Sequence, residues 1–127
     1  LQKRVNYLNE IIKELKLSDI RAIDTRCEDY AGGNREKYEV VTARAVANLK
    51  VLSELCLPLV KENGYFIAMK GKATEELDEA KAMIGTLGGK IEHINEFNLP
   101  LEESNRTLIK IKKEKKTDKI YPRKKIK

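Results

Sequence analysis

The stretch "NGYFIAMKG", residues 63–71, decides the fold class that this sequence predicts. Gly64 supplies a turn, and residues 65–69 then form a nearly continuous apolar run. A strand with one face in water alternates apolar and polar side chains, whereas a continuous run is typical of a sheet that is covered on both faces. The stretch therefore predicts a central strand of an α/β protein.

The segments before this strand alternate between helical and extended patterns. Apolar residues spaced by three and four predict a first helix that ends near Leu17, followed by a short strand over residues 20–25. The polar, glycine-containing stretch 26–38 predicts a loop that cannot bury itself. A strand over 39–43 comes next. The helix expected after it starts at about Ala45, is ended or kinked by Pro58, and has one apolar face made of Val46, Leu49, Leu52 and Cys56.

The segments after the central strand predict one more helix and two final strands. Thr74, followed by two glutamates, is a favourable helix start, and this helix turns Leu77, Ala80 and Ile84 inward before it stops at Gly88 and Gly89. Strands over 90–98 and 106–113 have no helix between them, so they should pair antiparallel. Helical crossovers elsewhere imply a mostly parallel sheet.

Composition and charge restrict the class of protein. The chain has 127 residues, about one domain, and a net charge of +6. Residues 112–127 carry nine basic and two acidic residues, so we separate a domain over 1–113 from a basic tail over 114–127. Such a tail is either a solvated terminus or a contact for phosphate backbones. No signal peptide and no apolar run of about 20 residues is present, which predicts a cytoplasmic protein.

The two cysteines and the single histidine carry no evident chemistry. Cys27 and Cys56 lack the spacing of metal ligands, so both are expected to be buried free thiols. His93 lies in a strand-like alternation, and we expect it on the surface.

Three basic residues follow the predicted strands. Arg26, Arg44 and Lys70 each come directly after a strand, and ligands of open parallel sheets bind at the carboxyl ends of the strands. We therefore expect the three side chains to meet at one rim and to hold an anionic ligand. The alternative is that each of them pairs with a nearby carboxylate, such as Glu28, Asp29 or Glu54.

Several motifs, in order, carry a resemblance to a known family. The segments "KRVNYL", "TRCEDY", "YEVVTARAVANL", "LPLVKENGYFIAMKG", "NRTLIKIKK" and "YPRK" resemble the bacterial ribosomal RNA small-subunit methyltransferase family known as RsmG or GidB. The resemblance runs from the first helix to the last residue. It implies a Rossmann-like methyltransferase fold of class I, with strand order 3-2-1-4-5-7-6, and S-adenosyl-L-methionine as cofactor. It also implies methylation of N7 of a guanine in 16S ribosomal RNA, free or in the small ribosomal subunit, by an intact protein that is a monomer.

The resemblance also implies roles for individual residues. Cys27 and Glu28 match the segment that lines the adenine pocket of the cofactor, and Arg44 matches a catalytic arginine next to the cofactor. The positions that match or suggest RNA contacts are Arg26, Lys70, Arg106, Lys124 and Lys125. Tyr121 either accompanies the tail along the RNA or packs the tail back onto the domain. Ala43 replaces the serine that usually precedes Arg44, a small departure.

A larger departure is that the N-terminal part of the family pattern has no counterpart here. The glycine-rich turn that approaches the cofactor and the acidic strand end that holds its ribose do not occur in this sequence, which opens within the helix after the second strand. We therefore expect a fragment that lacks the first two strands, binds cofactor weakly and is inactive alone. The strand 20–25 then lacks its neighbours, and the strand 39–43 becomes an edge. We expect either self-association through that edge or loose packing of residues 1–38.

Two other classes of function stay open. A non-catalytic RNA-binding α/β module would suit the shortened pattern and would retain RNA binding without methyl transfer. Another α/β enzyme, such as a nucleotide-dependent oxidoreductase, would need a phosphate-binding glycine fingerprint, which the sequence lacks.

The absence of a paired acid and base fits the N7 methylation that the resemblance implies, because N7 of guanine carries a lone pair and no proton.

Overall fold

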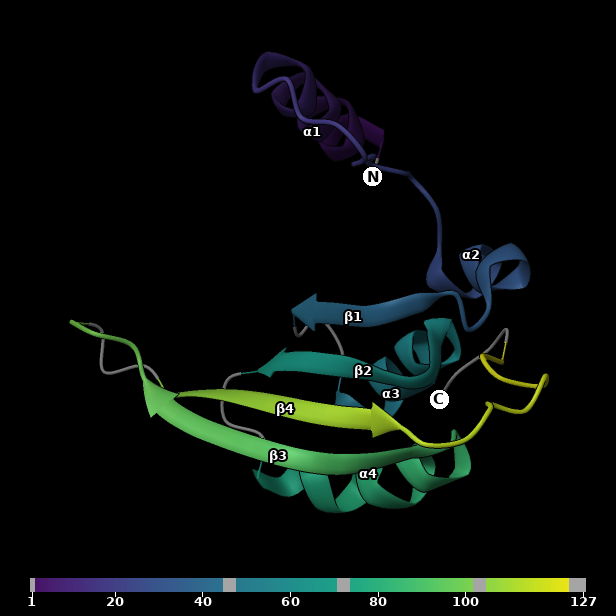
Figure 1. Cartoon of the computed structure of the whole chain (residues 1–127). Helices are drawn as coiled ribbons and strands as arrows, with labels where there is room; N and C mark the ends of the chain where they lie inside the picture. The colour runs from purple at the N-terminus through teal and green to yellow at the C-terminus, as the bar shows by residue number, and fades with distance from the viewer. Residues whose placement is uncertain (1, 45–47, 71–73, 102–104, 124–127) are drawn as a thin grey trace.

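Four strands form one sheet in the order β1-β2-β4-β3 (Figure 1). The computed structural model describes residues 2–44, 48–70, 74–101 and 105–123. The strands are β1 (Tyr38–Arg44), β2 (Val60–Lys70), β3 (Gly89–Asn98) and β4 (Asn105–Lys113). β1 and β2 run parallel, whereas β4 is antiparallel to both β2 and β3. This order matches the 4-5-7-6 half of the sheet that the resemblance implies, and the structure confirms an α/β fold.

The helices that cover the sheet pack against one of its faces. They are α3 (Leu49–Cys56) and α4 (Thr74–Thr86), with the short 3-10 helix η1 (Leu57–Leu59) after α3. Their buried side chains meet alternate residues of the two central strands, namely Phe66 and Ala68 of β2 and Ile109 and Ile111 of β4. Leu77, Ala80 and Ile84 of α4 join this core, as the sequence predicts.

The start of α3 differs from the prediction, whereas its end agrees. Asn48 is the N-cap, and its side chain accepts a hydrogen bond of 3.0 Å from the backbone nitrogen of Val51. The helix therefore begins at Leu49, four residues later than expected, and Ala45 and Val46 lie outside the described residues. Pro58 lies within η1 and ends the α-helix, because it cannot donate a backbone hydrogen bond.

β2 is longer than the apolar run that predicts it. The strand includes Asn63 and Gly64, and the register to β1 shifts there, so that Tyr38 pairs with Val60 but Val40 pairs with Tyr65. A Cβ atom at Gly64 would lie 2.5 Å from the carbonyl oxygen of Glu39. Gly64 therefore allows a close approach of two backbones within the sheet rather than a separate turn before it.

Two predictions for the first 38 residues are wrong. Residues 20–25 form no strand, because within the described residues no neighbouring strand offers them a hydrogen-bonding partner. The expected loop over 26–38 contains the helix α2 (Cys27–Asn34), which contacts α3 and η1 and buries Ala31. The hydroxyl groups of Tyr30 and Tyr38 hydrogen-bond each other, and this contact ties α2 to the start of β1.

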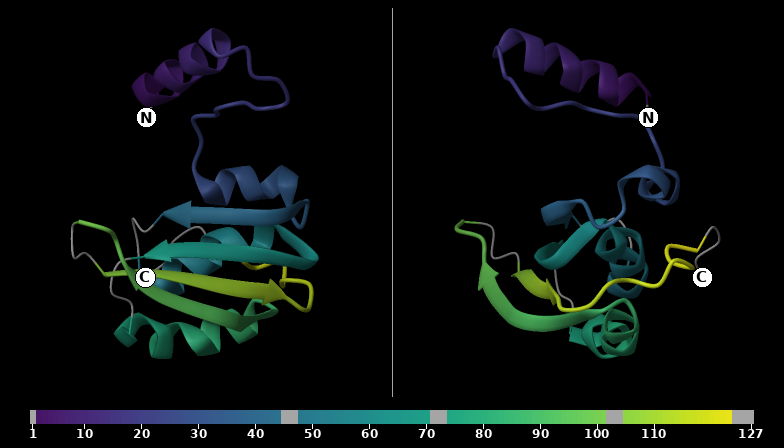
Figure 2. Two further views of the ribbon diagram at one scale, coloured as in Figure 1. Left: turned by 60° about the vertical axis from the view of Figure 1, so that its left-hand side comes forward. Right: turned by 45° about the vertical axis from the view of Figure 1, so that its right-hand side comes forward.

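The first helix, α1 (Gln2–Glu14), lies apart from the sheet (Figures 1 and 2). None of its residues is buried, and its apolar stripe includes the exposed side chain of Leu8. The expected loose packing therefore applies to α1 and to the segment that follows it, but not to α2. Within the described part of the chain, β1 pairs with β2 alone, which confirms that it is an edge strand.

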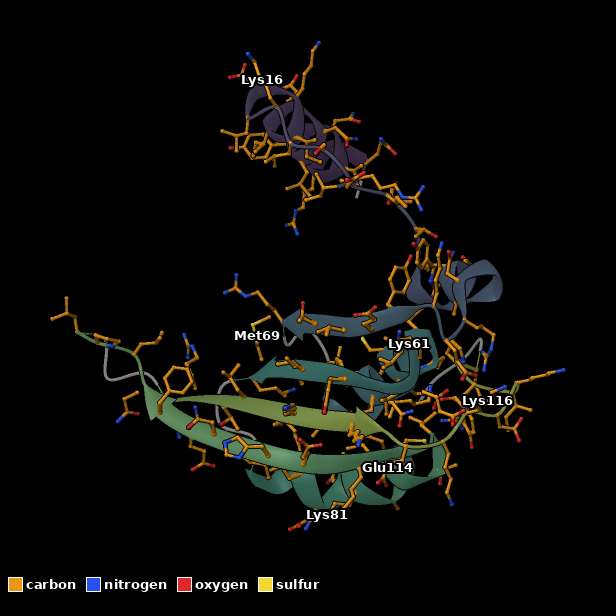
Figure 3. The ribbon with its side chains drawn as sticks, in the orientation of Figure 1. Lys16, Lys61, Met69, Lys81, Glu114 and Lys116 are labelled. Atoms are coloured by element: carbon orange, nitrogen blue, oxygen red, sulfur yellow. The ribbon has the colours of Figure 1, made fainter. Side chains whose placement is uncertain are left out.

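The described part of the C-terminal segment, residues 114–123, folds back onto the domain. Arg35 donates hydrogen bonds to the carbonyl oxygens of Thr117, Asp118 and Tyr121. Tyr121 packs against the core, which is the second of the two alternatives for this residue. Lys116 lies at the end of the sheet opposite Met69 (Figure 3).

Arg123 fixes this segment to α3. Its guanidinium donates to both carboxylate oxygens of Glu54 at 2.7 to 3.1 Å, and its backbone nitrogen donates to the same carboxylate at 2.8 Å. The Glu54 side chain is only 1% exposed. Burial alone would raise the pKa of Glu54, but the hydrogen bonds and the charge of Arg123 outweigh it and lower that pKa. The carboxylate is therefore ionised in the folded protein.

Lys113 is a buried cation at the end of β4. Its ammonium donates hydrogen bonds to the carbonyl oxygens of Leu57, at 2.7 Å, and Val60, at 3.0 Å. These backbone acceptors at and just after η1 therefore have a hydrogen-bond partner. The side chain is fully buried, and burial lowers the pKa of Lys113 to about 8. Glu36 opposes this shift, because its negative charge favours the ammonium.

We expect Lys113 to make the protein more stable as the pH rises from about 8 to about 10.5. Over that range the unfolded chain still holds the proton that the folded chain has lost, so the free energy of unfolding increases with pH. Urea unfolding of the wild type and of Lys113→Met at several pH values measures the difference, which cancels the titration of other groups. A difference that does not change with pH would contradict the assignment.

The remaining residues singled out in the sequence behave simply. Cys56 is a buried free thiol, as expected, and His93 is exposed on β3. The side chain of Cys27 is outside the description. Among the described residues, no helix is long and apolar enough to cross a membrane.

Candidate functional site at the carboxyl end of the sheet

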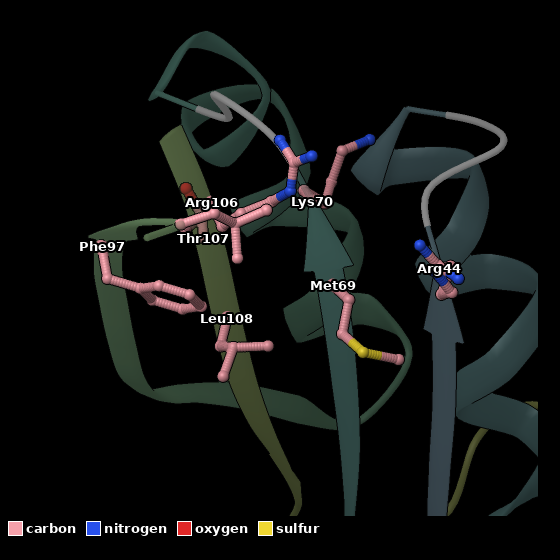
Figure 4. A pocket seen from close by; sticks show the side chains of 8 residues that line it. Arg44, Met69, Lys70, Phe97, Arg106, Thr107 and Leu108 are labelled. Atoms are coloured by element: carbon pink, nitrogen blue, oxygen red, sulfur yellow. The ribbon is translucent and has the colours of Figure 1, made fainter. Parts of the chain in front are cut away.

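A pocket of about 550 Å³ lies where β1 and β2 end and where β3 passes into β4 (Figure 4). Its lining comes from all four strands and the β3–β4 connection: Arg44, Met69, Lys70, Phe97, Leu99, Arg106, Thr107 and Leu108. The carboxyl ends of parallel strands are the places where open α/β sheets bind their ligands. The pocket is therefore the first candidate for the functional site.

The floor of the pocket is apolar. Met69 and Leu108 are directly paired across β2 and β4, and Phe97 is paired with Arg106 across β3 and β4. The side chains of Met69, Leu108 and Phe97 approach the same space from three strands (Figure 4). Phe97 is 38% exposed, so part of its ring is available to a ligand. An aromatic ring beside aliphatic side chains suits a flat, partly apolar ligand such as a nucleobase.

Two exposed arginines border this floor. Arg44 ends β1 and Arg106 lies near the start of β4, on different sides of the apolar residues (Figure 4). Neither guanidinium forms an ion pair with a described carboxylate, although that of Arg106 donates a hydrogen bond of 3.1 Å to the carbonyl oxygen of Asn105. A planar guanidinium binds phosphate and carboxylate oxygens in pairs. The arrangement can therefore hold an anionic group next to a flat ring.

Lys70 lines the pocket but is engaged by a carboxylate. Its ammonium lies 2.6 Å from Oε1 of Glu76, and the residue is 8% exposed. The same oxygen accepts a hydrogen bond of 2.9 Å from the backbone nitrogen of Leu49. The alternative of pairing with a carboxylate thus holds for Lys70, with Glu76 rather than Glu28, Asp29 or Glu54 as the partner. The sequence indicated Glu76 only as part of a helix start.

The other predicted site residues are not brought together by the described structure. Arg26 precedes α2 as its N-cap and does not line the pocket, and because residues 20–25 form no strand, it does not follow one. The prediction that Arg26, Arg44 and Lys70 meet at one rim is therefore wrong for Arg26, since the cations that line the pocket are Arg44, Lys70 and Arg106. Cys27 and Glu28 begin α2, with side chains outside the description, and Lys124 and Lys125 lie outside the described residues.

Comparisons with known proteins identify the family of this chain and agree with its fold. The model of a family described as GidB, rRNA small subunit methyltransferase G, matches residues 1–109. The chain belongs to this family. A protein named Ribosomal RNA small subunit methyltransferase G from Bacillus cytotoxicus is 52% identical over 127 residues. The protein of the same name from Oceanobacillus iheyensis is 51% identical.

The chain spans about half the length of these GidB-family relatives, since the match covers 98% of the chain and 53% of each relative. A solved structure described as "crystal structure of M1.HpyAVI-SAM complex" shares the fold, with a TM-score of 0.50 and 14% sequence identity. That similarity covers 80% of this chain and 58% of the other. At this level of identity, the similarity shows that the two chains share a fold.

Proposed function

We propose that this chain takes part in methyl transfer from S-adenosyl-L-methionine to N7 of a guanine in 16S ribosomal RNA. Membership of the GidB family supports this reaction class, and the pocket with its two exposed arginines is the single observation that supports an RNA-facing site. The substrate is 16S ribosomal RNA, free or in the small ribosomal subunit, so we expect the protein in the cytoplasm. Alone, the chain is inactive, because the cofactor contacts that it supplies are incomplete.

In the proposed reaction, the chain positions the reactants and supplies no acid or base catalysis. The guanine N7 atom offers an in-plane lone pair, so no proton has to be removed before it attacks a methyl group. Holding the reactants in line can lower the activation free energy by about 7 to 11 kcal/mol at most. Phe97 and Leu108 would hold the base, Arg106 would bind a neighbouring phosphate, and Arg44 would bind an anionic group beside the reacting atoms.

The residues present fit part of the cofactor. When bound, S-adenosyl-L-methionine supplies a methyl group on a positively charged sulfur. Arg44 would hold its carboxylate, since the guanidinium is exposed at the pocket and has no described acidic partner. Cys27 and Glu28, at the start of α2, would line its adenine ring. The glycine-rich turn and acidic residue of the family pattern are not in this sequence, so the proposed fit is partial.

Basic residues away from the pocket would contact the RNA backbone. We assign Arg26, Lys124 and Lys125 to phosphates. Lys70 would act indirectly, because its ammonium is held by Glu76. The fold of residues 114–123 against the domain means that the C-terminal segment would present its charges from the far end of the sheet.

A non-catalytic RNA-binding module is the second candidate. The observation that favours it is that one chain contains the whole described pocket but only part of the family's cofactor motifs. Both candidates predict RNA binding at the pocket, and they differ in methyl transfer.

The experiment that separates them uses labelled S-adenosyl-L-methionine and 16S ribosomal RNA. The chain is assayed alone and mixed with the part of the Bacillus cytotoxicus relative that lies outside the matched residues. We expect no incorporation by the chain alone and N7-methylguanosine, identified by mass spectrometry, from the mixture. RNA binding without methylation in the mixture would favour the module. The absence of both RNA binding and methylation would contradict both candidates.

We expect Phe97→Ala to weaken RNA binding by the chain about 5- to 150-fold, since a stacked base contributes roughly 1 to 3 kcal/mol. We expect Arg106→Ala to weaken it as well, since the variant loses a phosphate contact. Fluorescence anisotropy with a labelled single-stranded oligonucleotide from 16S ribosomal RNA measures this. Leu101→Ala is the matched control, because Leu101 is fully exposed on the β3–β4 connection and does not line the pocket. Equal affinity of all three variants and the wild type would place the RNA elsewhere.

A further inference from the structure

The helix α2 is attached to the domain by few contacts of its own. It is 8 residues long, and a helix of that length is not stable without tertiary packing. Gly32 and Gly33 lie within it and weaken it, and a Cβ atom at either position would meet no described atom within 4 Å. Ala31 is buried, and the hydroxyl of Tyr30 bonds to that of Tyr38. The placement of α2 therefore depends on a small number of anchors.

Arg35 anchors the end of α2 to a distant part of the chain. It is the C-cap of the helix, and its guanidinium donates to three carbonyl oxygens of the C-terminal segment, residues 114–123. The acceptors are 82 to 86 residues away in the sequence, and those of Thr117 and Asp118 lie at 3.1 and 3.0 Å. A guanidinium holds its donors in a fixed planar fork, so three acceptors together fix its position. Figure 1 shows α2 and the C-terminal segment, in yellow, at the same end of the sheet.

The C-terminal segment is itself held on both sides of these carbonyl groups. Its start is fixed at Gly88, whose carbonyl oxygen accepts a hydrogen bond of 2.8 Å from the backbone nitrogen of Glu114. Its end is fixed at Glu54, which binds the guanidinium of Arg123 at 2.7 Å. The carbonyl groups that bind Arg35 lie between these two points. The segment is therefore a fixed support for the end of α2.

We propose that Arg35 is a positioning residue for the cofactor, and that it acts through α2 by holding this helix on the C-terminal segment. The inference rests on the proposed function, in which Cys27 and Glu28, at the start of α2, line the adenine ring. A helix that is held at its end keeps its first turn in one place, whereas a released helix occupies that place for a fraction of the time. The apparent affinity for the cofactor falls in proportion to that fraction.

A direct contact of Arg35 with RNA fits the structure less well. Arg35 lines a cavity together with Lys116 and Lys119, which could attract phosphates, but Glu36 and Asp118 line the same cavity and would repel them. The guanidinium of Arg35 also donates already to three carbonyl oxygens. The geometry therefore favours support of α2 over binding of a phosphate.

Nuclear magnetic resonance of the full chain, labelled with 15N, tests the proposal without methyl transfer. The probe is S-adenosyl-L-methionine, titrated into the wild type and into Arg35→Ala, because amide shifts report weak binding and the residues that respond to it. We expect the signals of α2 to shift in the wild type. Binding by Arg35→Ala should be about tenfold weaker, since the placement of α2 that binds the cofactor is then less populated.

Hydrogen exchange without cofactor shows whether α2 is released. In Arg35→Ala, the amides of α2 should exchange at least about tenfold faster than in the wild type, whereas those of β4 should stay within about twofold, because the opening is local. RNA binding, measured by anisotropy with the single-stranded oligonucleotide from 16S ribosomal RNA, should also stay within about twofold. A loss of global stability would instead change all three measurements.

Two further variants keep the test decisive. Arg35→Lys retains the positive charge but not the planar fork, so it should weaken cofactor binding at least about threefold, and less than Arg35→Ala does. If Arg35→Ala unfolds in circular dichroism, Arg35→Lys decides. Arg4→Ala removes the same kind of side chain from an exposed position on α1, and it should bind the cofactor within about twofold of the wild type.

Three outcomes overturn the proposal. Cofactor binding that neither variant of Arg35 weakens would exclude Arg35 from positioning the cofactor and would leave the proposed function intact. Weaker RNA binding by Arg35→Ala, with unchanged cofactor binding, would make Arg35 an RNA contact. The absence of cofactor binding by the wild type at millimolar concentration, or shifts confined to residues outside α2, would contradict the placement of the adenine ring in the proposed function, and the inference with it.

Discussion

Arg123→Ala is expected to lower the free energy of unfolding by about 3 kcal/mol, because it leaves the buried carboxylate of Glu54 without its cation. The backbone nitrogen of residue 123 can still donate to Glu54, so the loss measures the guanidinium alone. The Arg123 side chain is 45% exposed, which keeps the expected loss at the lower end for a buried pair. Urea unfolding at neutral pH gives the value.

Two further variants test the cause of this loss. Lys119→Ala removes a positive charge from the same segment without breaking a described ion pair, and it should change stability by less than about 0.5 kcal/mol. The double variant Glu54→Gln and Arg123→Ala should lose less free energy of unfolding than the two single variants lose together, because no buried charge is then left unpaired. Additive losses would show that Arg123 acts by packing and not through Glu54.

The same pair predicts acid sensitivity. The pKa of Glu54 is lowered in the folded protein, so its contribution is complete above the ordinary carboxyl value of 4.5 and is lost as the pH falls through the lower folded value. In Arg123→Ala this contribution is absent, and the stabilities of the variant and the wild type should converge at low pH.

Glu76→Ala is expected to cost about 2 to 3 kcal/mol and to alter the pocket, since one carboxylate oxygen serves two donors there. It accepts from the ammonium of Lys70 at the end of β2 and from the first backbone nitrogen of α3. Its loss would leave a nearly buried ammonium with less compensation. We therefore expect weaker RNA binding in addition to lower stability, measured by unfolding and by anisotropy.

Glu76→Gln and Glu79→Ala distinguish these roles. The glutamine oxygen can still accept from the backbone of Leu49 but carries no charge, so about half of the loss in stability should remain. Glu79 is exposed on the same helix, and its removal should have little effect. If Glu76→Gln behaves as the wild type, the charge of Glu76 does not stabilise Lys70.

Patterns that depend on neighbouring residues were predicted well from the sequence. The apolar run of β2, the glutamate-rich start of α4, the glycines after it and the alternation in β4 all have local causes. The family resemblance added the strand order, and the sheet confirms the half that is present. The helix α2 was missed because two adjacent glycines, Gly32 and Gly33, and a weak apolar stripe hide it in a polar stretch.

Features that depend on distant partners could not be predicted. Residues 20–25 contain Ile20 and Ile23, which favour a strand, but a strand also needs a hydrogen-bonding neighbour. Glu54 and Arg123 are 69 residues apart in the sequence, and no local pattern joins them. In the same way, the ion pair of Lys70 with Glu76 depends on how α4 packs against the sheet. Phe97 has no feature in the sequence that separates it from an ordinary strand residue.

Photo-cross-linking tests most directly whether the pocket at the carboxyl end of the sheet faces RNA. The chain is irradiated with a 16S ribosomal RNA fragment that contains 4-thiouridine, and the cross-linked peptides are identified by mass spectrometry. We expect cross-links at Phe97 and neighbouring residues of the β3–β4 connection, and their loss in Arg106→Ala. Cross-links confined to residues 114–123, at the opposite end of the sheet, would contradict an RNA-facing pocket.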